Sequence, residues 1–256
     1  MSRNIDLSQQ VALVTGGGQG IGRQTALTLA GAGANIAINY FPDSDGRNQS
    51  IASATAQEII AACGPGTAET FAADVRDATQ VAAMYDAIQQ RFSRLDVVVN
   101  NAGILRDRSI KKMSLDEWSS VIDTNLSGVF HSCQQAALKM APGGRIVNVA
   151  SLAAVMGFFG QANYAAAKSG VLGLTKVLAR ELARSNIRVN AVAPGVVDTE
   201  MGQSIPEENR KLMLQQIPLA RFAEPREISD VILFLVSDLS TYMTGQTLHV
   251  NGGWWF

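Results

Sequence analysis

The 256-residue sequence has few of the residues that build metal sites or disulfides. It contains two cysteines, Cys63 and Cys133, and two histidines, His131 and His249. The cysteines lack the spacing of paired metal ligands, and so few thiols are typical of a protein from a reducing compartment. We expect both cysteines to be core or surface thiols, and we expect no metal site.

Charged residues and long apolar runs are also scarce. Charged side chains make up 17% of the chain, and 21 basic residues nearly balance 22 acidic ones, for a net charge of -1. This balance gives no electrostatic footprint for nucleic acid or an anionic membrane. No run of about 18 apolar residues predicts a membrane span, and the N-terminal MSRNIDLSQQ has no apolar signal core. We therefore expect a cytoplasmic protein with small-molecule partners.

A hydroxyl, a phenol and an amine occur within one stretch, NVASLAAVMGFFGQANYAAAK. A helix starting near Ala162 would place Tyr164 and Lys168 on one face, because residues four apart are neighbours on a helix. An ammonium beside Tyr164 would lower the phenol pKa from about 10, which suits a general acid/base. Ser151 follows the apolar run 146–150, so its hydroxyl would lie at the carboxyl end of a strand, where α/β sheets bind ligands. Taken alone, the Tyr-Lys spacing also fits an ordinary amphipathic helix.

A glycine-rich turn follows the first apolar segment. The β-branched run from Val11 to Thr15 predicts a strand, and residues 23–32 continue with helical spacing. Between them, Gly16, Gly20 and Gly22 would let the backbone approach a pyrophosphate at the helix N-terminus. The same glycines could form a plain tight connection, and their spacing differs from the G-x-G-x-x-G fingerprint.

The end of the second predicted strand, Asn35 to Tyr40, bears on the choice of cofactor. An acidic residue at this place would select NAD by binding the ribose, whereas a basic residue would accept a 2′-phosphate. The sequence has Tyr40-Phe41-Pro42 and then the polar loop 43–50, whose single base is Arg47. This loop could read a phosphate or be an irregular solvated loop. We therefore favour NADP(H) slightly over NAD(H).

Strands and helices alternate along the whole chain. Further strands are predicted at residues 69–73, 96–99, 146–150, 187–193 and 247–250, and helices at 50–63, 77–92, 115–140, 163–184 and 225–236. With 47% hydrophobic residues and no linker or repeat, residues 1–256 predict one α/β domain. We expect a doubly wound Rossmann-type fold with a seven-stranded parallel sheet. The polar segment 196–218 fits a substrate lid over a site at the strand ends.

These motifs together resemble the short-chain dehydrogenase/reductase family over essentially the whole chain. Within the family, NAVAPGVVDTEM, YAAAKSG and GQTLHVNGG are most similar to β-ketoacyl-acyl carrier protein reductases. The resemblance implies an NAD(P)(H)-dependent oxidoreductase that interconverts a ketone, including a 3-oxoacyl thioester, and a secondary alcohol. It rests on the following residues, in family order: Thr15-Gly16-x3-Gly20-Ile21-Gly22, Asn100-Asn101-Ala102-Gly103, Asn125, Ser151, Tyr164-x3-Lys168 and Pro194-Gly195.

The resemblance also implies a role for each site residue. Tyr164 would transfer the proton, Ser151 would hold the substrate oxygen, and Lys168 would lower the tyrosine pKa while binding the nicotinamide ribose. Asn125 would hold a water that links Lys168 to solvent. Hydride transfer builds negative charge on a carbonyl oxygen, which a hydroxyl and an acidic phenol stabilise. The expected cofactor-binding residues are Gly16, Gly18, Gln19, Gly20, Ile21, Gly22, Tyr40, Arg47, Asp74, Val75, Asn101, Ala102, Gly103, Tyr164, Lys168, Pro194, Gly195, Val197 and Thr199.

Two features depart from the pattern of the carrier-protein reductases. Pro142 and Ser185 stand where those enzymes have basic residues that dock the acidic carrier protein, and Arg184 is one residue away. A free ketone, a CoA ester or a secondary alcohol is therefore an alternative substrate. Gln19 stands where NADP-dependent relatives often have arginine. The rival prediction is a catalytically silent cofactor-sensing or scaffolding protein of the same fold, although all three reactive side chains are present.

The chain ends in three consecutive aromatic residues, Trp254, Trp255 and Phe256. Chain ends are normally frayed and polar, and an exposed apolar patch of this kind marks an interface. The family resemblance implies tetramers with two-fold symmetry. We expect a homotetramer whose tail is buried between subunits. The alternative is that the tail folds back onto its own subunit beside the lid.

Overall fold

Seven parallel strands form one sheet, in the order β3-β2-β1-β4-β5-β6-β7. The computed structural model describes residues 5–256, so residues 1–4 of the predicted domain and N-terminal segment lie outside the described residues. The predicted α/β class and seven-stranded parallel sheet are confirmed, and each strand bound differs from the prediction by at most one residue. The strands are β1 (Val11–Val14), β2 (Asn35–Tyr40), β3 (Ala68–Ala72), β4 (Val97–Asn100), β5 (Arg145–Val149), β6 (Arg188–Pro194) and β7 (Thr247–Val250).

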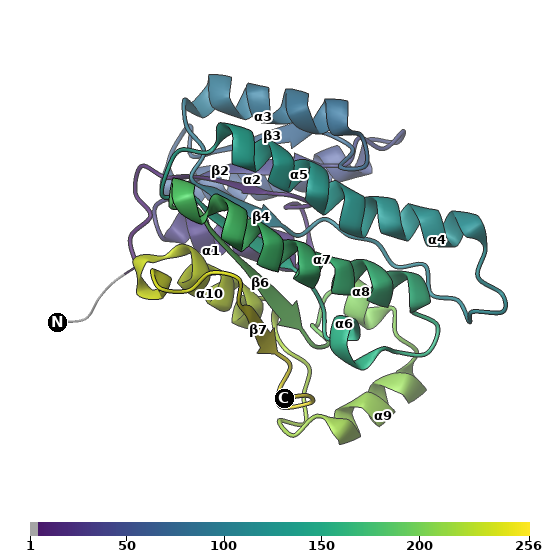
Figure 1. Ribbon diagram of the computed structural model, residues 1–256. Helices are drawn as coiled ribbons and strands as arrows, with labels where there is room; N and C mark the ends of the chain where they lie inside the picture. Colours follow the sequence, from purple (N-terminus) through teal and green to yellow (C-terminus); the bar gives the residue numbers. More distant parts are fainter. Residues whose placement is uncertain (1–4) are drawn as a thin grey trace.

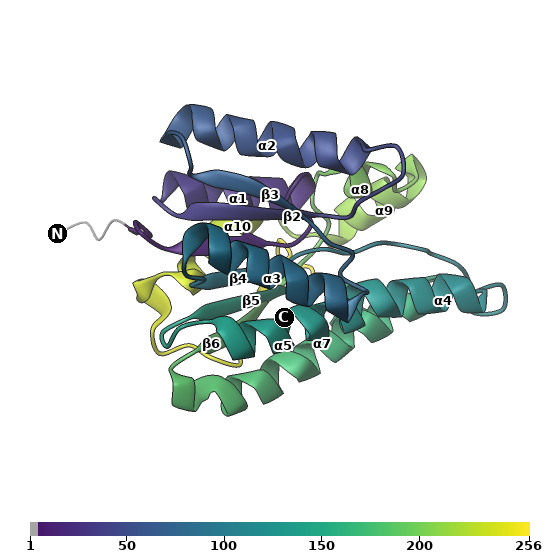
Figure 2. The same cartoon turned by 90° about the horizontal axis from the view of Figure 1, so that it is seen from above.

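Helices cover both faces of this sheet (Figures 1 and 2). One layer holds α1 (Gly20–Gly31), α2 (Arg47–Cys63) and α10 (Pro225–Val236). The other layer holds α3 (Ala78–Phe92), α4 (Leu115–Ile122), α5 (Gly128–Lys139) and α7 (Ala162–Glu181). Within residues 5–256, none of the helices has the length and hydropathy needed to cross a membrane.

The strands supply side chains to two separate cores, because successive strand residues point to opposite faces. Val14 and Ile38 pack against the α1, α2 and α10 layer. Leu13 and Val98 pack against the α3, α5 and α7 layer. Both faces are buried at the central strands β1 and β4, so these two strands are almost entirely apolar, as is typical of parallel sheets. Parallel pairing also places the carboxyl ends of all the strands at one edge, and the site lies there.

Several helical segments differ from the sequence prediction. The helix predicted from residue 50 begins at Arg47, because Gly46 adopts a left-handed conformation (φ 69°) and the Asp43 carboxylate accepts a hydrogen bond from the Asn48 N–H at 3.0 Å. Arg47 therefore lies on a helix rather than in a loop. The segment predicted as one or two helices over 115–140 contains α4 and α5 joined by the π-helix Asp123–Ser127. A short helix, α6 (Ala153–Met156), was not predicted.

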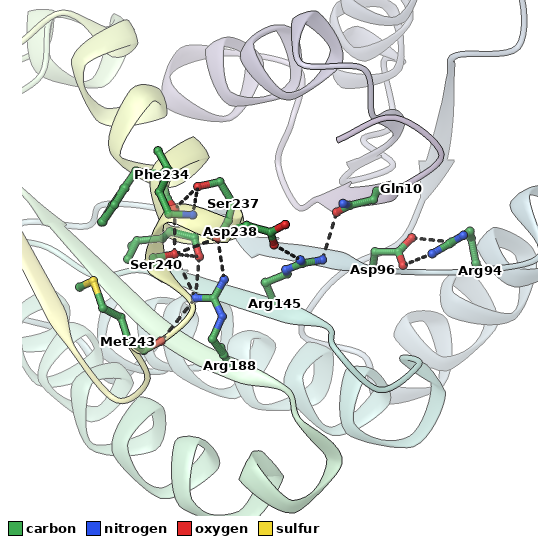
Figure 3. A network of polar contacts seen from close by, with 12 residues as sticks. Gln10, Arg94, Asp96, Arg145, Arg188, Phe234, Ser237, Asp238, Ser240 and Met243 are labelled. Carbon is green, nitrogen blue, oxygen red and sulfur yellow. Dashed lines mark hydrogen bonds and ion pairs between the residues drawn. The ribbon is translucent and has the colours of Figure 1, made fainter. Parts of the chain in front are cut away.

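A partly buried arginine, Arg188, connects the start of β6 to the end of α10 (Figure 3). The Arg188 guanidinium donates to the Leu235 carbonyl at 2.9 Å and to the Ser237 carbonyl at 3.0 Å. It also donates to the Ser240 hydroxyl at 3.1 Å. Burial and the neighbouring Arg145 lower the pKa of Arg188. A cation at the carbonyl end of a helix is favourable because the helix dipole is negative there.

We expect Arg188→Met to lower the free energy of unfolding by about 2–4 kcal/mol, because it leaves several buried carbonyl and hydroxyl groups without a donor. Urea denaturation measures the change. Arg226→Met is the matched control, because that arginine is 76% exposed in its ion pair with Asp230 and should cost less than about 0.5 kcal/mol. Equal stability of the two variants would contradict the structural role of Arg188.

Candidate active site

The hydroxyl, phenol and amine predicted to act together meet beyond the carboxyl end of β5. Ser151 follows this strand, and Tyr164 and Lys168 lie one turn apart at the start of α7. The Ser151 hydroxyl is close enough to the Tyr164 phenol to act on the pKa of that phenol. The Lys168 ammonium lies 5.7 Å from the centre of the Tyr164 ring. The structure thus brings the three residues into one site.

The electrostatics of the pair differ from the sequence prediction. Burial raises the pKa of Tyr164 to about 12, against the lowering effect of the nearby Ser151 hydroxyl. Burial also lowers the pKa of Lys168 to about 8, and its ammonium donates to the Val149 carbonyl at 2.7 Å. The predicted net lowering of the tyrosine pKa is therefore wrong, because burial moves that pKa upward. Loss of water around the phenol outweighs the nearby cation, which is directed to a backbone acceptor.

Asn125 lies in the π-helix, and its fully buried side chain binds a backbone segment. Its amide oxygen accepts from the Ile104 N–H at 2.8 Å, and its amide nitrogen donates to the Ile104 carbonyl at 2.9 Å. Gly103 lies beside it, where a Cβ would be 3.2 Å from the Asn125 oxygen and 3.7 Å from the Lys168 ammonium. Asn125 therefore fixes the loop after β4 against the lysine. Single π-helical turns, which insert one extra residue into an α-helix, occur often at functional sites.

The Thr15 hydroxyl joins the glycine turn to the asparagine motif after β4. Its oxygen accepts hydrogen bonds from the N–H groups of Asn101 at 3.0 Å and Ala102 at 3.1 Å. The Asn101 side chain in turn donates to the carbonyls of Thr15 at 3.0 Å and Gly16 at 3.1 Å. These hydrogen bonds of Asn101 thus hold the glycine turn in place. Thr15 was recognised in the motif but was not predicted as a site residue.

Asn39 is a second residue that the sequence prediction missed. Its buried side chain accepts from the Gly16 N–H at 3.3 Å and donates to the Ala73 carbonyl at 3.1 Å. It therefore holds the glycine turn against the ends of β2 and β3. The only sequence signal was a polar residue inside the apolar strand NIAINY.

The glycine turn fits the pyrophosphate of a dinucleotide. Helix α1 begins there without a side-chain cap and without an acidic residue in its first turn, so its N-terminal N–H groups can bind an anion. A Cβ at Gly22 would overlap the Gly16 carbonyl, and Gly16 and Gly20 have positive φ values of 60° and 54°. Side chains at these positions would close or strain the turn. Gly18, Gln19 and Ile21 lie in the same turn, with Gln19 as the N-cap residue.

The remaining predicted cofactor residues lie at the same edge of the sheet. Tyr40 and Pro194 end β2 and β6, and the Gly195 N–H donates to the Val250 carbonyl at 2.9 Å. Buried Val197 forms a bridge with Ala223. Thr199 caps α8 (Glu200–Gln203), and its methyl group lies beside Gly20. Asp74, followed by buried Val75, forms an ion pair with Arg76 at 2.6 Å.

A polar cleft opens beside the glycine turn, where the predicted phosphate reader Arg47 lies. The Arg47 guanidinium donates to the Glu200 carboxylate at 3.4 Å, across the gap between α2 and α8. Arg47 and Glu200 side chains are 66% and 74% exposed. The cleft is lined by Gln19, Asp43, Asp45, Arg47, Asn48, Glu200, Met201 and Ser204.

The predicted lid contains α8 and a second helix, α9 (Glu207–Gln216), which buries none of its residues. The aromatic tail contacts it, because the Trp254 indole donates to the Gln216 side chain at 3.2 Å. Trp254 also packs on Phe158 with ring centres 5.4 Å apart. Trp255 packs on His249, whereas Phe256 is 96% exposed. The two tryptophans thus make the contacts of the alternative prediction, in which the tail folds back beside the lid.

Comparison with known proteins decides the family. The family profile described as Enoyl-(Acyl carrier protein) reductase matches residues 16–255. The chain is 47% identical over 246 residues to a 3-oxoacyl-[acyl-carrier-protein] reductase of Staphylococcus aureus, covering 94% of this chain and 96% of the relative. The chain belongs to the short-chain dehydrogenase/reductase family.

Other relatives agree with this assignment. A 3-oxoacyl-[acyl-carrier-protein] reductase of Thermotoga maritima is 42% identical over 249 residues, covering 96% of this chain and 98% of the relative. The crystal structure of a short-chain dehydrogenase/reductase from Brucella melitensis, described as a glucose/ribitol dehydrogenase, superposes with a TM-score of 0.91. It is 32% identical, and the match covers 99% of this chain and all of that chain. The protein is thus an oxidoreductase of this family, and nothing supports the catalytically silent alternative.

The titration of Lys168 predicts the pH dependence of this short-chain dehydrogenase/reductase. Because burial lowers the pKa of Lys168 to about 8, the ammonium is present below that pH and is lost above it. We expect kcat/KM for carbonyl reduction to fall above about pH 8 as the cation beside Tyr164 disappears. Tyr164, with its pKa raised to about 12, stays protonated over this range.

Stopped-flow or steady-state assays over about pH 6 to 10 test this prediction on the wild type and on Lys168→Arg. The guanidinium stays charged above pH 12, so the residual activity of the arginine variant should lack the decline near pH 8. A wild-type profile that stays flat to high pH would show that Lys168 does not control the rate.

Proposed function

We propose that the protein reduces the 3-oxo group of an acyl thioester to a 3-hydroxy group with a nicotinamide cofactor. The observation that carries this proposal is the assembly of Ser151, Tyr164 and Lys168 beyond β5, opposite the glycine turn on the same edge of the sheet. The relatives from S. aureus and T. maritima are named as 3-oxoacyl reductases, which supports the substrate class.

The side chains have distinct tasks in this proposal. The bound cofactor supplies the hydride. The Ser151 hydroxyl donates a hydrogen bond to the carbonyl oxygen as negative charge develops there. Tyr164 then gives its proton to that oxygen, and Lys168, cationic below about pH 8, stabilises the phenolate that remains. Asn125 fixes the loop beside Lys168, and we retain for it the proposed role of holding a water that connects the lysine with solvent.

The raised pKa of Tyr164 favours reduction over oxidation as the working direction. A phenol with a pKa of about 12 carries its proton at neutral pH and is still far more acidic than the secondary alcohol that forms. Oxidation would instead need the phenolate, which burial disfavours. The site therefore rests in the state that reduction requires.

We propose NADP(H) as the preferred cofactor. No acidic residue follows Tyr40 directly, and Arg47 on the first turn of α2 is a cation that lines the cleft beside the glycine turn. The 16–22 turn and the N-terminus of α1 would hold the pyrophosphate. Lys168 would hold the nicotinamide ribose.

The thioester carrier is proposed to be CoA or another small group rather than a dedicated acyl carrier protein. Pro142 and Ser185 are exposed and uncharged at the positions where carrier-protein reductases have docking cations, and only Arg184 offers a charge nearby. Segment 196–218 is proposed as the substrate lid. The cytoplasmic location expected from the sequence stays a prediction.

Replacing Tyr164 by Phe removes the proton donor and nothing else. We expect turnover with acetoacetyl-CoA to fall by about 10²–10⁴-fold, while the Kd for NADPH, measured by its fluorescence, stays unchanged. Tyr242→Phe is the control, because that side chain is fully exposed and should keep full activity. A Tyr164→Phe enzyme with most of its kcat would refute the mechanism.

We also propose that the protein is a homotetramer. The outer surfaces of α5 and α7 carry the exposed apolar side chains Phe130, Leu138 and Val177, with exposures of 46%, 73% and 51%. Figure 2 shows both helices along one side of the molecule. Apolar side chains grouped in this way favour association through a two-fold axis. The exposed Phe256 is proposed to extend a second contact.

Light scattering coupled to gel filtration tests the assembly. We expect the wild type to have four times the chain mass of 27.2 kDa, and Phe130→Glu to dissociate into smaller species. Ile110→Glu, in a loop and 72% exposed, should remain tetrameric. A monomeric wild type would exclude the tetramer, and a tetrameric Phe130→Glu would exclude this helical face.

A further inference from the structure

We propose that Glu200, on the lid, sets the preference between cofactors with and without a 2′-phosphate by competing with that phosphate for Arg47. This inference rests on the proposed function, because it concerns the cofactor of the same site. It assigns a specificity role to a lid residue that lies far from β2 in the sequence. The phosphate reader and its competitor are thus carried by two different parts of the fold.

In the structure, the proposed phosphate-binding residue, Arg47, already binds an anion. Arg47 is the only cation among the described residues that line the cleft, and it shares that lining with the carboxylates of Asp43, Asp45 and Glu200. Its guanidinium donates to Glu200 at 3.4 Å. Asp43 is held locally, because its carboxylate accepts from the Asn48 N–H at 3.0 Å and 3.1 Å. Glu200 is therefore the acid that Arg47 binds.

The position of Glu200 follows from the cap that starts α8. The Thr199 side chain accepts from the Gly202 N–H at 3.3 Å, and the methyl of Thr199 lies next to Gly20 of the glycine turn. This cap fixes the first residue of α8 beside the cofactor cleft. Arg47 is likewise the first residue of its helix, α2, after Gly46 in a left-handed conformation. Two helix starts from distant segments thus face each other across the cleft.

The Glu200 carboxylate and a 2′-phosphate would compete for the same N–H donors of Arg47. A guanidinium binds a carboxylate or a phosphate with the same fork of N–H donors, so one replaces the other. A 2′-phosphate must therefore displace Glu200 from Arg47 and then lie near its negative charge. A cofactor with a free 2′-hydroxyl does neither, so Glu200 penalises only the phosphorylated form. The pair is exposed, so the effect is largest at low ionic strength.

The test measures binding of two nucleotides that differ in the 2′-phosphate. NADP⁺ and NAD⁺ are titrated calorimetrically, at low salt, into the wild type, Glu200→Gln, Arg47→Gln and the double variant. We expect Glu200→Gln to tighten NADP⁺ binding about fivefold and to change NAD⁺ binding less than about twofold. In the Arg47→Gln background, the gain from Glu200→Gln should disappear. Glu208→Gln removes the same charge from α9, outside the cleft lining, and should change neither affinity.

Two results would overturn the inference. If Glu200→Gln changes both nucleotides equally, the residue does not discriminate between them. If its gain persists undiminished without Arg47, Glu200 acts by direct repulsion and not by competition. Because the titrations need no turnover, they do not depend on the role of Tyr164. Failure of the wild type to bind either nucleotide would instead contradict the proposed function itself.

Discussion

The hydrogen bonds around Thr15 are the constraint on which both halves of the site depend. Its hydroxyl satisfies the N–H groups of Asn101 and Ala102, while the Asn101 side chain satisfies two carbonyls of the glycine turn. Each group is buried or partly buried, so each needs a partner. The turn after β1 and the loop after β4 are therefore fixed as one unit. That unit leads directly to Gly103, which lies between Asn125 and Lys168.

Burial sets the acid–base state of the site more strongly than the charge of its neighbours. It raises the pKa of Tyr164 and lowers the pKa of Lys168, so burial favours the neutral form of each group, and a neutral phenol lies beside a cation only below about pH 8. Pairs of groups whose environments shift their pKa values in opposite directions commonly divide the work of an acid and a base. The same desolvation makes Lys168 a costly residue to bury, and its hydrogen bond to Val149 offsets part of that cost.

The sequence was sufficient for the sheet and for the reactive trio, because both depend on local pattern. Apolar β-branched runs predicted every strand, and the spacing of Tyr164 and Lys168 predicted their shared helix face. The pKa of Tyr164 could not be predicted, since it depends on the solvent excluded by segments far away in the sequence. The π-helix around Asn125, the hydrogen bonds of Arg188 and the ion pair of Arg47 also depend on tertiary contacts. The sheet edge that gathers the site follows from pattern, whereas its electrostatics follow from packing.

The contact between Trp254 and Gln216 gives the enzyme an optical probe of the proposed lid. Indole emission responds to the polarity around the ring, and this indole donates a hydrogen bond to the last residue of α9 while it packs on Phe158 of the opposite loop. Any displacement of α9 must therefore break or reshape the surroundings of one chromophore.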